Sequence, residues 1–279
     1  MTESDCDSRF VRRGNVRLHY AVAGDGPTLI FVHGIPDFWN GWRHQIAHFR
    51  GSRRVVAVDL RGVNLSDKPA GTAAYRIGEL VRDLVAVIDD LGLARADIVG
   101  HDWGAIVAWW TAMLAPSRVS RLAALAVPHP ARWVEAQEKG EVAYSAEYLA
   151  QMVEAAPGAR FDARWMSAWV EDPLARAELE AALQRSDAES LRNFYRANQI
   201  RQGGRFAAIP PVALPVLTLY GTEDRLIPQH YYVPDAALVT GGHRTVAIPG
   251  VGHYPHQEAA GQVNAELDAW LSARVNPGD

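Results

Sequence analysis

The residues best suited to chemistry form a five-residue pattern, Gly-His-Asp-Trp-Gly, at positions 100–104. A short apolar run over 96–99 precedes it and a longer apolar segment follows it, so it joins a predicted strand to a predicted helix. The two glycines allow a tight, strained turn, from which the central side chain, Asp102, projects. A serine in such a turn attacks carbonyl groups. A carboxylate instead attacks saturated carbon and forms an alkyl ester, so Asp102 is the predicted nucleophile.

An ester on Asp102 has to be hydrolysed, which requires a base to activate water and an acidic residue to orient that base. The turn resembles the nucleophile elbow of α/β-hydrolases, in which the acid and then the histidine follow later strands in chain order. Asp224 comes directly after an apolar run over 216–220, and His253 follows a run over 246–248. Open α/β sheets form their sites at such strand ends. We therefore predict Asp224 as the orienting acid and His253 as the base.

Three neighbouring residues are less favoured alternatives. Glu223 adjoins Asp224, but the usual spacing of a Gly-x-x-Asp turn favours Asp224. His256 lies three residues beyond His253 and is its nearest rival as the base. His101 adjoins the nucleophile but points away from the turn, so we predict a packing or hydrogen-bonding role.

Negative charge that develops on oxygen during ester hydrolysis must be met by backbone N–H groups. The sequence His-Gly-Ile-Pro at 33–36 follows the first buried strand. We predict the N–H groups of Ile35 and Trp103 as the oxyanion hole. The alternative is that residues 33–36 only terminate a strand.

The elements that position these residues follow from hydrophobic periodicity. Near-continuous apolar runs at 29–32, 55–58, 98–99 and 122–127 predict buried parallel strands. Apolar positions at steps of three and four predict a helix over 77–91, closed by Gly92. A hairpin turning at 14–15 precedes these strands, and a closing helix carries Val263, Leu267, Trp270 and Leu271 on one face.

No convincing strand occurs from residue 130 to about 206, where we predict four or five short helices. The predicted fold is therefore α/β, an α/β-hydrolase fold with a mostly parallel sheet flanked by helices and an inserted all-helical cap. The core domain is predicted at 1–129 and 207–279, and the cap domain at 130–206.

Several motifs together resemble the epoxide hydrolases of the α/β-hydrolase fold, which are related to haloalkane and haloacetate dehalogenases. They are His-Gly-Ile-Pro-Asp-Phe-Trp at 33–39, Asp-Leu-Arg-Gly at 59–62, the elbow at 100–104, Pro-His-Pro at 128–130 and Gly-His at 252–253. The resemblance implies a two-step reaction without a cofactor or a metal. The aspartate opens an epoxide to a hydroxyalkyl ester, and histidine-activated water then releases a vicinal diol.

The resemblance also implies two cap tyrosines that bind and protonate the epoxide oxygen. Tyr195 lies in Asn-Phe-Tyr-Arg at 193–196, which matches the family motif residue for residue. The other tyrosine has no sharp motif. Tyr148 lies where the family has it, and Tyr144, one helical turn earlier, competes with it.

We predict a substrate pocket lined by His33, Pro36, Trp39, Trp133 and Phe194. Aromatic residues such as Trp39, Trp103, Trp133, Trp165 and Phe194 suggest an apolar or aromatic epoxide. One departure from the family lies nearby, since Val63-Asn64 stands where Tyr-Gly is common.

Two other functions compete with this interpretation. A dehalogenase could bind halide with Trp103, but Ile35 offers no second side-chain donor, and an arginine after the nucleophile, as in haloacetate dehalogenases, is missing. A non-catalytic ligand-binding homologue would usually lack a member of the triad, and none is missing here.

Composition narrows the remaining possibilities. A net charge of −4 gives no reason to expect a nucleic-acid or membrane partner. Cys6 is the only cysteine, and the polar start of the chain lacks the features of a secretion signal, so we expect a cytoplasmic protein. The expected partner is a small epoxide. A homodimer is left open.

Overall fold

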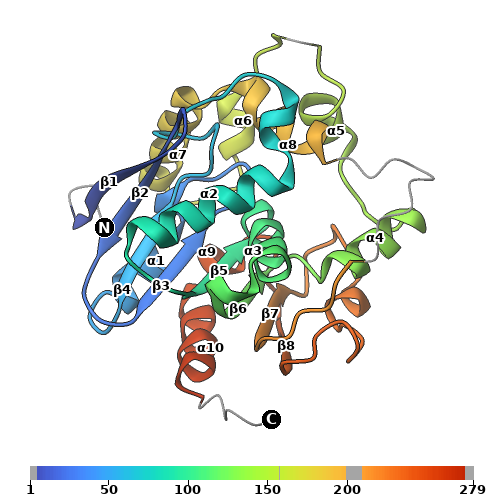
Figure 1. Ribbon diagram of the computed structural model, residues 1–279. Helices are drawn as coiled ribbons and strands as arrows, with labels where there is room; N and C mark the ends of the chain where they lie inside the picture. The colour runs from blue at the N-terminus through green and yellow to red at the C-terminus, as the bar shows by residue number, and fades with distance from the viewer. Residues whose placement is uncertain (1–4, 157, 199–208, 274–279) are drawn as a thin grey trace.

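An eight-stranded sheet forms the centre of the protein, whose computed structural model describes residues 5–156, 158–198 and 209–273 (Figure 1). The strand order is β1-β2-β4-β3-β5-β6-β7-β8. The strands are β1 (Asp7–Arg13), β2 (Val16–Ala23), β3 (Thr28–Val32), β4 (Arg54–Val58), β5 (Ala96–His101), β6 (Val119–Leu125), β7 (Val216–Gly221) and β8 (His243–Ile248).

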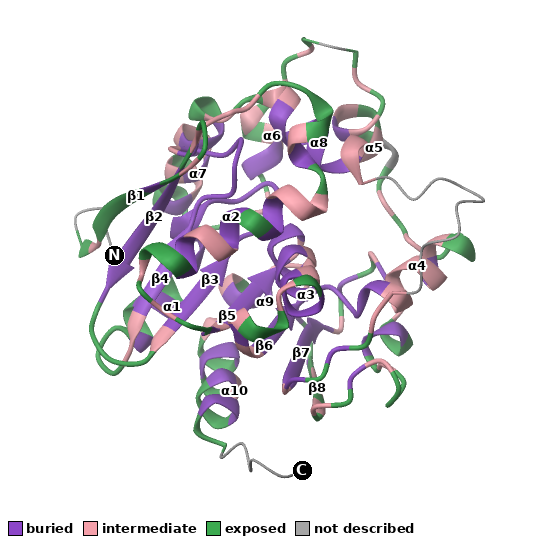
Figure 2. Cartoon of the chain, viewed as in Figure 1, coloured by how far each residue is buried: buried purple, intermediate pink, exposed green. Residues whose placement is uncertain are grey.

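Strands β4, β3 and β5 to β8 pair in parallel, whereas β1 and β2 form the antiparallel hairpin predicted from the sequence. That hairpin turns at Gly14, whose φ of 59° favours glycine. The expected mostly parallel sheet is confirmed. The central strands β3 and β5 are buried almost throughout, as the continuous apolar runs predict (Figure 2).

Helices cover both faces of this sheet. Helix α3 packs against β5 and β6, with α2 beside it, and α1 packs against β4 and α10. Their bounds are α1 (Arg43–Phe49), α2 (Ile77–Asp90), α3 (Trp103–Leu114), α9 (Pro255–Glu258) and α10 (Ala260–Ser272).

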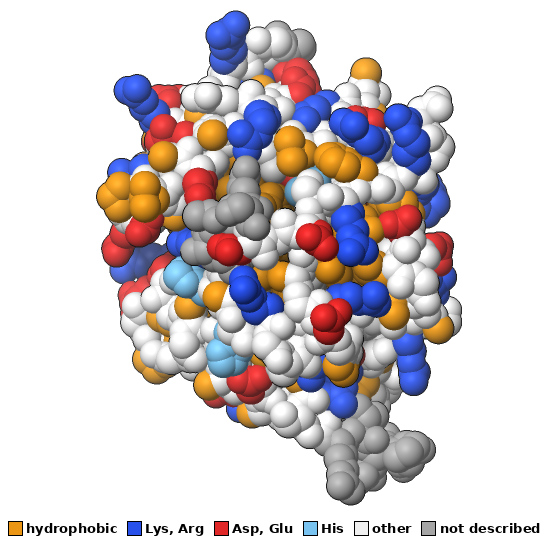
Figure 3. All heavy atoms as spheres, turned by 90° about the vertical axis from the view of Figure 1, so that its left-hand side faces the viewer, with side chains coloured by type: hydrophobic (Ala, Val, Ile, Leu, Met, Phe, Trp, Pro, Cys, Tyr) orange, Lys and Arg blue, Asp and Glu red, His pale blue; other side chains and the backbone are white. Residues whose placement is uncertain are grey.

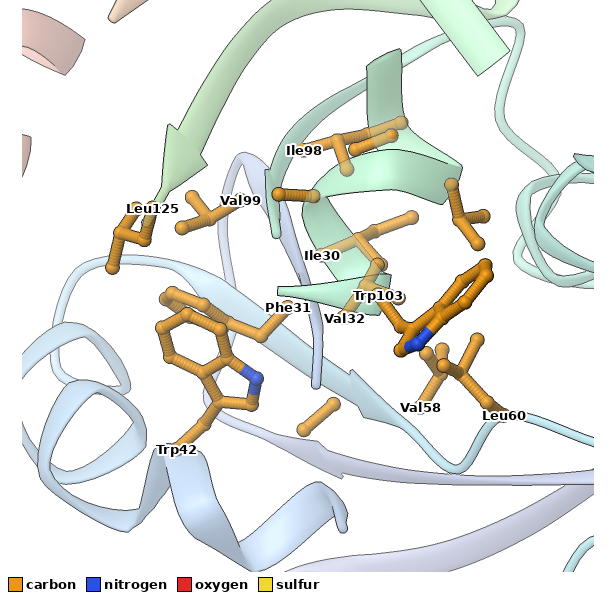
Figure 4. Packing of buried hydrophobic residues seen from close by; sticks show 14 of the residues in the cluster. Ile30, Phe31, Val32, Trp42, Val58, Leu60, Ile98, Val99, Trp103 and Leu125 are labelled. Atoms are coloured by element: carbon orange, nitrogen blue, oxygen red, sulfur yellow. The ribbon is translucent and has the colours of Figure 1, made fainter. Parts of the chain in front are cut away.

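Large side chains fill the space between the sheet and its helices. Phe31 of β3 packs on Trp42 with ring centroids 4.8 Å apart, and both side chains are fully buried (Figure 4). Trp103 at the start of α3 belongs to the same buried cluster, together with Val58 and Leu60 (Figure 4). Trp103 therefore anchors the helix that follows the nucleophile.

Five helices lie between β6 and β7 in the described part of the chain, within the range predicted for the cap. They are α4 (Pro130–Glu138), α5 (Ala146–Met152), α6 (Ala163–Ser167), α7 (Pro173–Arg185) and α8 (Ala188–Ala197). Helices α5 to α8 each begin after a residue whose side chain accepts a hydrogen bond from a free backbone N–H of the first turn. These capping residues are, in the order of the helices, Ser145, Asp162, Asp172 and Asp187. The predicted domain boundary at 206–207 lies outside the described residues.

Polar contacts tie these helices to the core. The Asn64 side chain donates to Asp59 at 2.8 Å and accepts from Arg185 of α7 at 2.7 Å. The Tyr75 hydroxyl donates to Ser190 of α8 at 2.6 Å. Asn64, which the sequence marks as a departure from the family pattern, therefore bridges the loop after β4 to the inserted helices.

The surface carries charges of both signs. Lysine and arginine side chains are interspersed with aspartate and glutamate on the face drawn in Figure 3. None of the helices in the described ranges is both long and apolar enough to cross a bilayer.

The two glycines of the elbow are required by close backbone approaches. A Cβ atom on Gly104 would lie 2.0 Å from the carbonyl oxygen of Val32, and one on Gly100 would lie 2.4 Å from that of Gly104. Both distances are much shorter than a van der Waals contact, and the atoms met belong to the backbone, which cannot rotate away as a side chain could. The helix after the nucleophile can therefore pack this closely on β3 only without these side chains.

We predict that Gly104→Ala lowers the free energy of unfolding by about 2 kcal/mol or more, because the added methyl group pushes α3 away from β3. Urea unfolding followed by circular dichroism measures this loss. The control is Gly51→Ala, since a Cβ atom there meets no other atom within 4 Å and its φ is not positive. Equal stability of the two variants would contradict the packing argument.

Candidate active site

The predicted nucleophile occupies a strained turn between β5 and α3. Asp102 has a φ of 49° and a ψ of −121°, an unusual conformation for a residue other than glycine. Its backbone N–H donates to the carbonyl oxygen of Leu125 at 3.2 Å, which fixes the turn to β6. Gly34 lies so close that a Cβ atom on it would be 2.5 Å from the Cβ atom of Asp102.

Three residues from separate strand ends meet at this turn. Nε2 of His253 lies 3.6 Å from Oδ2 of Asp102, within ion-pair range but longer than a hydrogen bond. Nδ1 of His253 lies 2.7 Å from Oδ2 of Asp224. Asp224 is buried and its other oxygen accepts from the Leu226 N–H, so this carboxylate holds the proton on Nδ1 and directs Nε2 toward Asp102.

The alternatives for acid and base lie elsewhere. The side chain of Glu223 is exposed, next to buried Asp224. His256 is fully buried and packs at a tilt on Trp42 with ring centroids 4.3 Å apart. The geometry thus favours Asp224 and His253 over both rivals.

One of the two predicted oxyanion donors contacts the nucleophile directly. The Ile35 N–H donates to Oδ1 of Asp102 at 2.9 Å. Trp103 is the first residue of α3, so its N–H has no acceptor within the helix. In the described part of the chain, the Asp102 side chain accepts a backbone hydrogen bond from Ile35 and none from Trp103. The Ile35 N–H therefore fixes Oδ1 of Asp102, whereas Oδ2 faces His253.

The two predicted tyrosines meet above the nucleophile. The hydroxyl groups of Tyr148 on α5 and Tyr195 on α8 are hydrogen-bonded to each other. The Tyr148 hydroxyl also lies 3.5 Å from the carbonyl oxygen of Ile35, and the Tyr195 ring packs edge-on against Trp103 at 5.1 Å. Tyr144 stacks on Tyr148 at 5.8 Å with the rings nearly parallel, and its hydroxyl makes no hydrogen bond within the described residues. Tyr148, rather than Tyr144, therefore pairs with Tyr195.

Burial keeps both tyrosines protonated. It raises the pKa of Tyr148 and that of Tyr195 well above the usual value of 10, and the nearby Asp102 charge adds to the effect in both. These phenols can donate hydrogen bonds over the whole physiological range of pH.

The triad carries opposite charges. Burial alone would lower the pKa of His253, but its contacts with Asp102 and Asp224 dominate and raise the pKa to about 10. Burial would likewise raise the pKa of Asp102, but His253 outweighs it and the pKa is lowered. At neutral pH the site therefore contains an imidazolium between two carboxylates.

His101 has the structural role that the sequence suggests. It is fully buried, and its Nε2 lies 2.8 Å from the carbonyl oxygen of His253, so it supports the loop of the predicted base. Burial holds the pKa of His101 and of His256 well below the usual value, so both rings are neutral.

One group of buried side chains could offer metal ligands. Among the described residues, it is formed by Asp37, His101 and His256, whose ligand atoms all lie within 4.8 Å of one another. Burial raises the pKa of Asp37 to about 6. Within this group, His256 packs on Trp42 and on His101, with ring centroids 4.3 and 4.4 Å apart.

A mostly apolar cavity of about 500 Å³ opens beside Trp103 and Tyr195. Its wall comes from α2, α3 and the helices inserted after β6, and includes Trp103, Ile106, Trp110, Trp133, Gln137, Tyr144, Tyr195 and Asn198. Of the five residues predicted for the pocket, only Trp133 belongs to this wall.

The other four predicted pocket residues are buried and do not belong to this wall. His33 is fully buried and accepts from the Leu60 N–H at 3.0 Å, so it joins two strand ends. Phe194 is fully buried against Trp103, and Trp39 and Pro36 are also buried. The wall residues Ile106, Trp110 and Gln137 are missing from the prediction, because Ile106 and Trp110 stand in a continuously apolar segment and Gln137 looks like a surface position of a helix.

Known proteins of one fold family are similar to this chain. The family model described as alpha/beta hydrolase fold matches residues 27–260. Epoxide hydrolase 2 of Caenorhabditis elegans is 43% identical over 129 residues, 46% of this chain and 36% of that protein. Epoxide hydrolase B of Mycobacterium tuberculosis is 47% identical over 132 residues, 45% of this chain and 37% of that protein. The matched part thus spans little more than a third of these relatives.

The solved structures agree over nearly the whole chain. An epoxide hydrolase from Bacillus megaterium, crystallised with an inhibitor, superposes with a TM-score of 0.83 at 26% identity, over 95% of this chain and 100% of that one. An epoxide hydrolase from Vigna radiata superposes with a TM-score of 0.80 at 24% identity, over 97% and 99%, which supports the fold. With the family model covering most of its length, the chain belongs to the α/β-hydrolase-fold family.

Proposed function

We propose that this protein is an epoxide hydrolase, which opens an epoxide through an alkyl ester on Asp102 and hydrolyses the ester to a vicinal diol. The observation that carries the proposal is the pair of hydroxyl groups of Tyr148 and Tyr195, next to the held carboxylate of Asp102 and beside an apolar cavity. Relatives and structural neighbours that are themselves named epoxide hydrolases support it.

In the first step, Oδ2 of Asp102 attacks an epoxide carbon and the carbon–oxygen bond of the ring breaks. The ring oxygen becomes an alkoxide, and the tyrosine pair stabilises it by hydrogen bonding and donates a proton. The product is a hydroxyalkyl ester, and one tyrosine is left as a phenolate. Because its raised pKa makes that phenolate a strong base, it recovers a proton at the expense of the His253 imidazolium.

The second step needs His253 as a neutral base. Esterification removes the charge of Asp102, which is one of the two carboxylates that raise the pKa of His253. The neutral imidazole then takes a proton from water, and the hydroxide attacks the ester carbonyl carbon. The charge on Oδ1 is met by the N–H groups of Ile35 and Trp103, and Oδ2 leaves with the diol as His253 returns the proton.

Other parts of the proposal extend the sequence predictions. The cap is proposed at 130–206 and the core at 1–129 and 207–279. The substrate is a small apolar epoxide. A cytoplasmic location stays a prediction, and the oligomeric state stays open.

We predict that Tyr195→Phe slows ester formation by roughly 10²–10³-fold, because one positioned donor to the alkoxide is lost. Hydrolysis of the ester should be nearly unchanged. Rapid-quench kinetics with a styrene-type epoxide separate the two steps.

The matched control is Tyr144→Phe, since that hydroxyl makes no hydrogen bond within the described residues although its ring stacks on Tyr148. Its rates should be close to those of the wild type. Undiminished epoxide opening by Tyr195→Phe would rule out the tyrosine assignment. Turnover of haloalkanes with no turnover of epoxides would overturn the proposed function itself.

We predict that Asp102→Asn lowers the pKa of His253 from its value of about 10, because the amide, like the ester, carries no charge. NMR titration of the imidazole nitrogens measures it. Since the pKa is raised above the unfolded value of 6.5, His253 contributes stability that is fully present below about pH 6.5 and is lost as the pH rises through about 10.

The control for this titration is Asp268→Asn, which removes an exposed carboxylate paired with His48 on α1. It should leave the His253 titration unchanged. An equally high pKa for His253 in the Asp102→Asn variant would show that Asp102 does not set the protonation of the base.

A further inference from the structure

The cavity wall contains a polar side chain that the proposed reaction does not use. Of its polar residues, Tyr195 is hydrogen-bonded to Tyr148, and Tyr144 stacks on the same tyrosine, so both belong to the reacting end. The Asn198 side chain makes three hydrogen bonds, to the backbone of Tyr75, Ile77 and Phe194. Asn198 is therefore committed to the structure.

Gln137 is different. It lines the same cavity, and its Oε1 is buried without a hydrogen-bond partner among the described residues. A buried amide oxygen without a partner is destabilising, and an apolar side chain of similar size would avoid that cost. Because this oxygen has no hydrogen bond to lose, the Gln137 amide can turn toward the cavity and bind a polar group of a ligand there.

Gln137 lies away from the reacting end. Helix α4 begins at Pro130, shortly after the end of β6, and leads away from the sheet (Figure 1). Seven residues further on, Gln137 is about 10 Å along the helix axis. Trp133, one turn before it, contacts the ring of Tyr144 at a centroid distance of 6.5 Å. From Trp133, ring contacts then lead through Tyr144 to Tyr148 of the tyrosine pair.

We propose that Gln137 binds a hydroxyl group at the far end of an elongated, otherwise apolar epoxide. This inference rests on the proposed function and names its substrate class. The amide can accept a hydrogen bond through Oε1 or donate one through Nε2, and a hydroxyl group can satisfy either. Trp110, Trp133 and Ile106 would enclose the apolar body of the substrate between the two ends.

The test compares two series of terminal epoxyalkanes of increasing chain length, one ending in a methyl group and one in a hydroxyl group. For each length, the ratio of kcat/KM for the hydroxyl compound to that for the methyl compound is measured in the wild type and in Gln137→Leu. At the chain length that reaches Gln137, the ratio should fall about tenfold in Gln137→Leu, as expected for one lost hydrogen bond. Shorter pairs should show no change.

Val134→Ala is the matched control, because Val134 lies on the same helix and in the same wall but offers no hydrogen bond. It should change kcat/KM for both members of a pair alike. If epoxides are turned over and the ratio is the same in the wild type and in Gln137→Leu at every length, this inference is wrong. If no epoxide in either series is turned over, the proposed function has failed instead.

Discussion

Two carboxylates and one imidazole meet at the carboxyl edge of the sheet, where both carboxylates raise the pKa of His253 and His253 in turn lowers that of Asp102. Asp224 fixes the proton on Nδ1 of His253, and Asp102 faces Nε2. The pair of acidic groups holds the imidazole as a cation, while the cation keeps Asp102 ionised in a largely buried place. An ionised Asp102 is what the first step of the proposed reaction needs, and the loss of its charge is what prepares His253 for the second.

The rest of the fold keeps these groups together. Each comes from the end of a different parallel strand, so the pairing of β5, β7 and β8 in one sheet sets their spacing. The strained φ of Asp102 persists because glycines on both sides let α3 pack onto β3. The inserted helices complete the site from above, and contacts such as Asn64 with Arg185 join them to the core. The inserted helices α5 and α8 thus position the tyrosine pair, whereas the strands β5, β7 and β8 position the triad.

The sheet could be predicted from the sequence because parallel strands that are buried on both faces must be continuously apolar. The edge strand β8 was predicted only from residue 246, because its first residues, His243, Arg244 and Thr245, are polar, as an edge tolerates. Helices α1 and α9 were missed because they are short and give little periodicity.

For the site, the strand-end positions of Asp102, Asp224 and His253 are visible in the sequence, and the structure brings the three together. Tyr144 and Tyr148 are one helical turn apart, so periodicity alone cannot separate them, and only the contact with Tyr195 does. The pocket was predicted least well. An aromatic residue in the sequence carries no sign of whether it faces a cavity or the core, which is why Phe194 was expected in a wall that instead contains Trp110.

The central claim is that Asp102 forms a covalent ester and that water then attacks the carbonyl carbon of this ester. A single turnover in water labelled with heavy oxygen, with enzyme in excess over epoxide, tests it most directly. Oδ2 of Asp102 should leave in the diol, so mass spectrometry should find the label in the peptide that contains Asp102 and not in the product. Label in the diol on the first turnover, with an unlabelled Asp102 peptide, would show that water attacks the epoxide directly and would contradict the account.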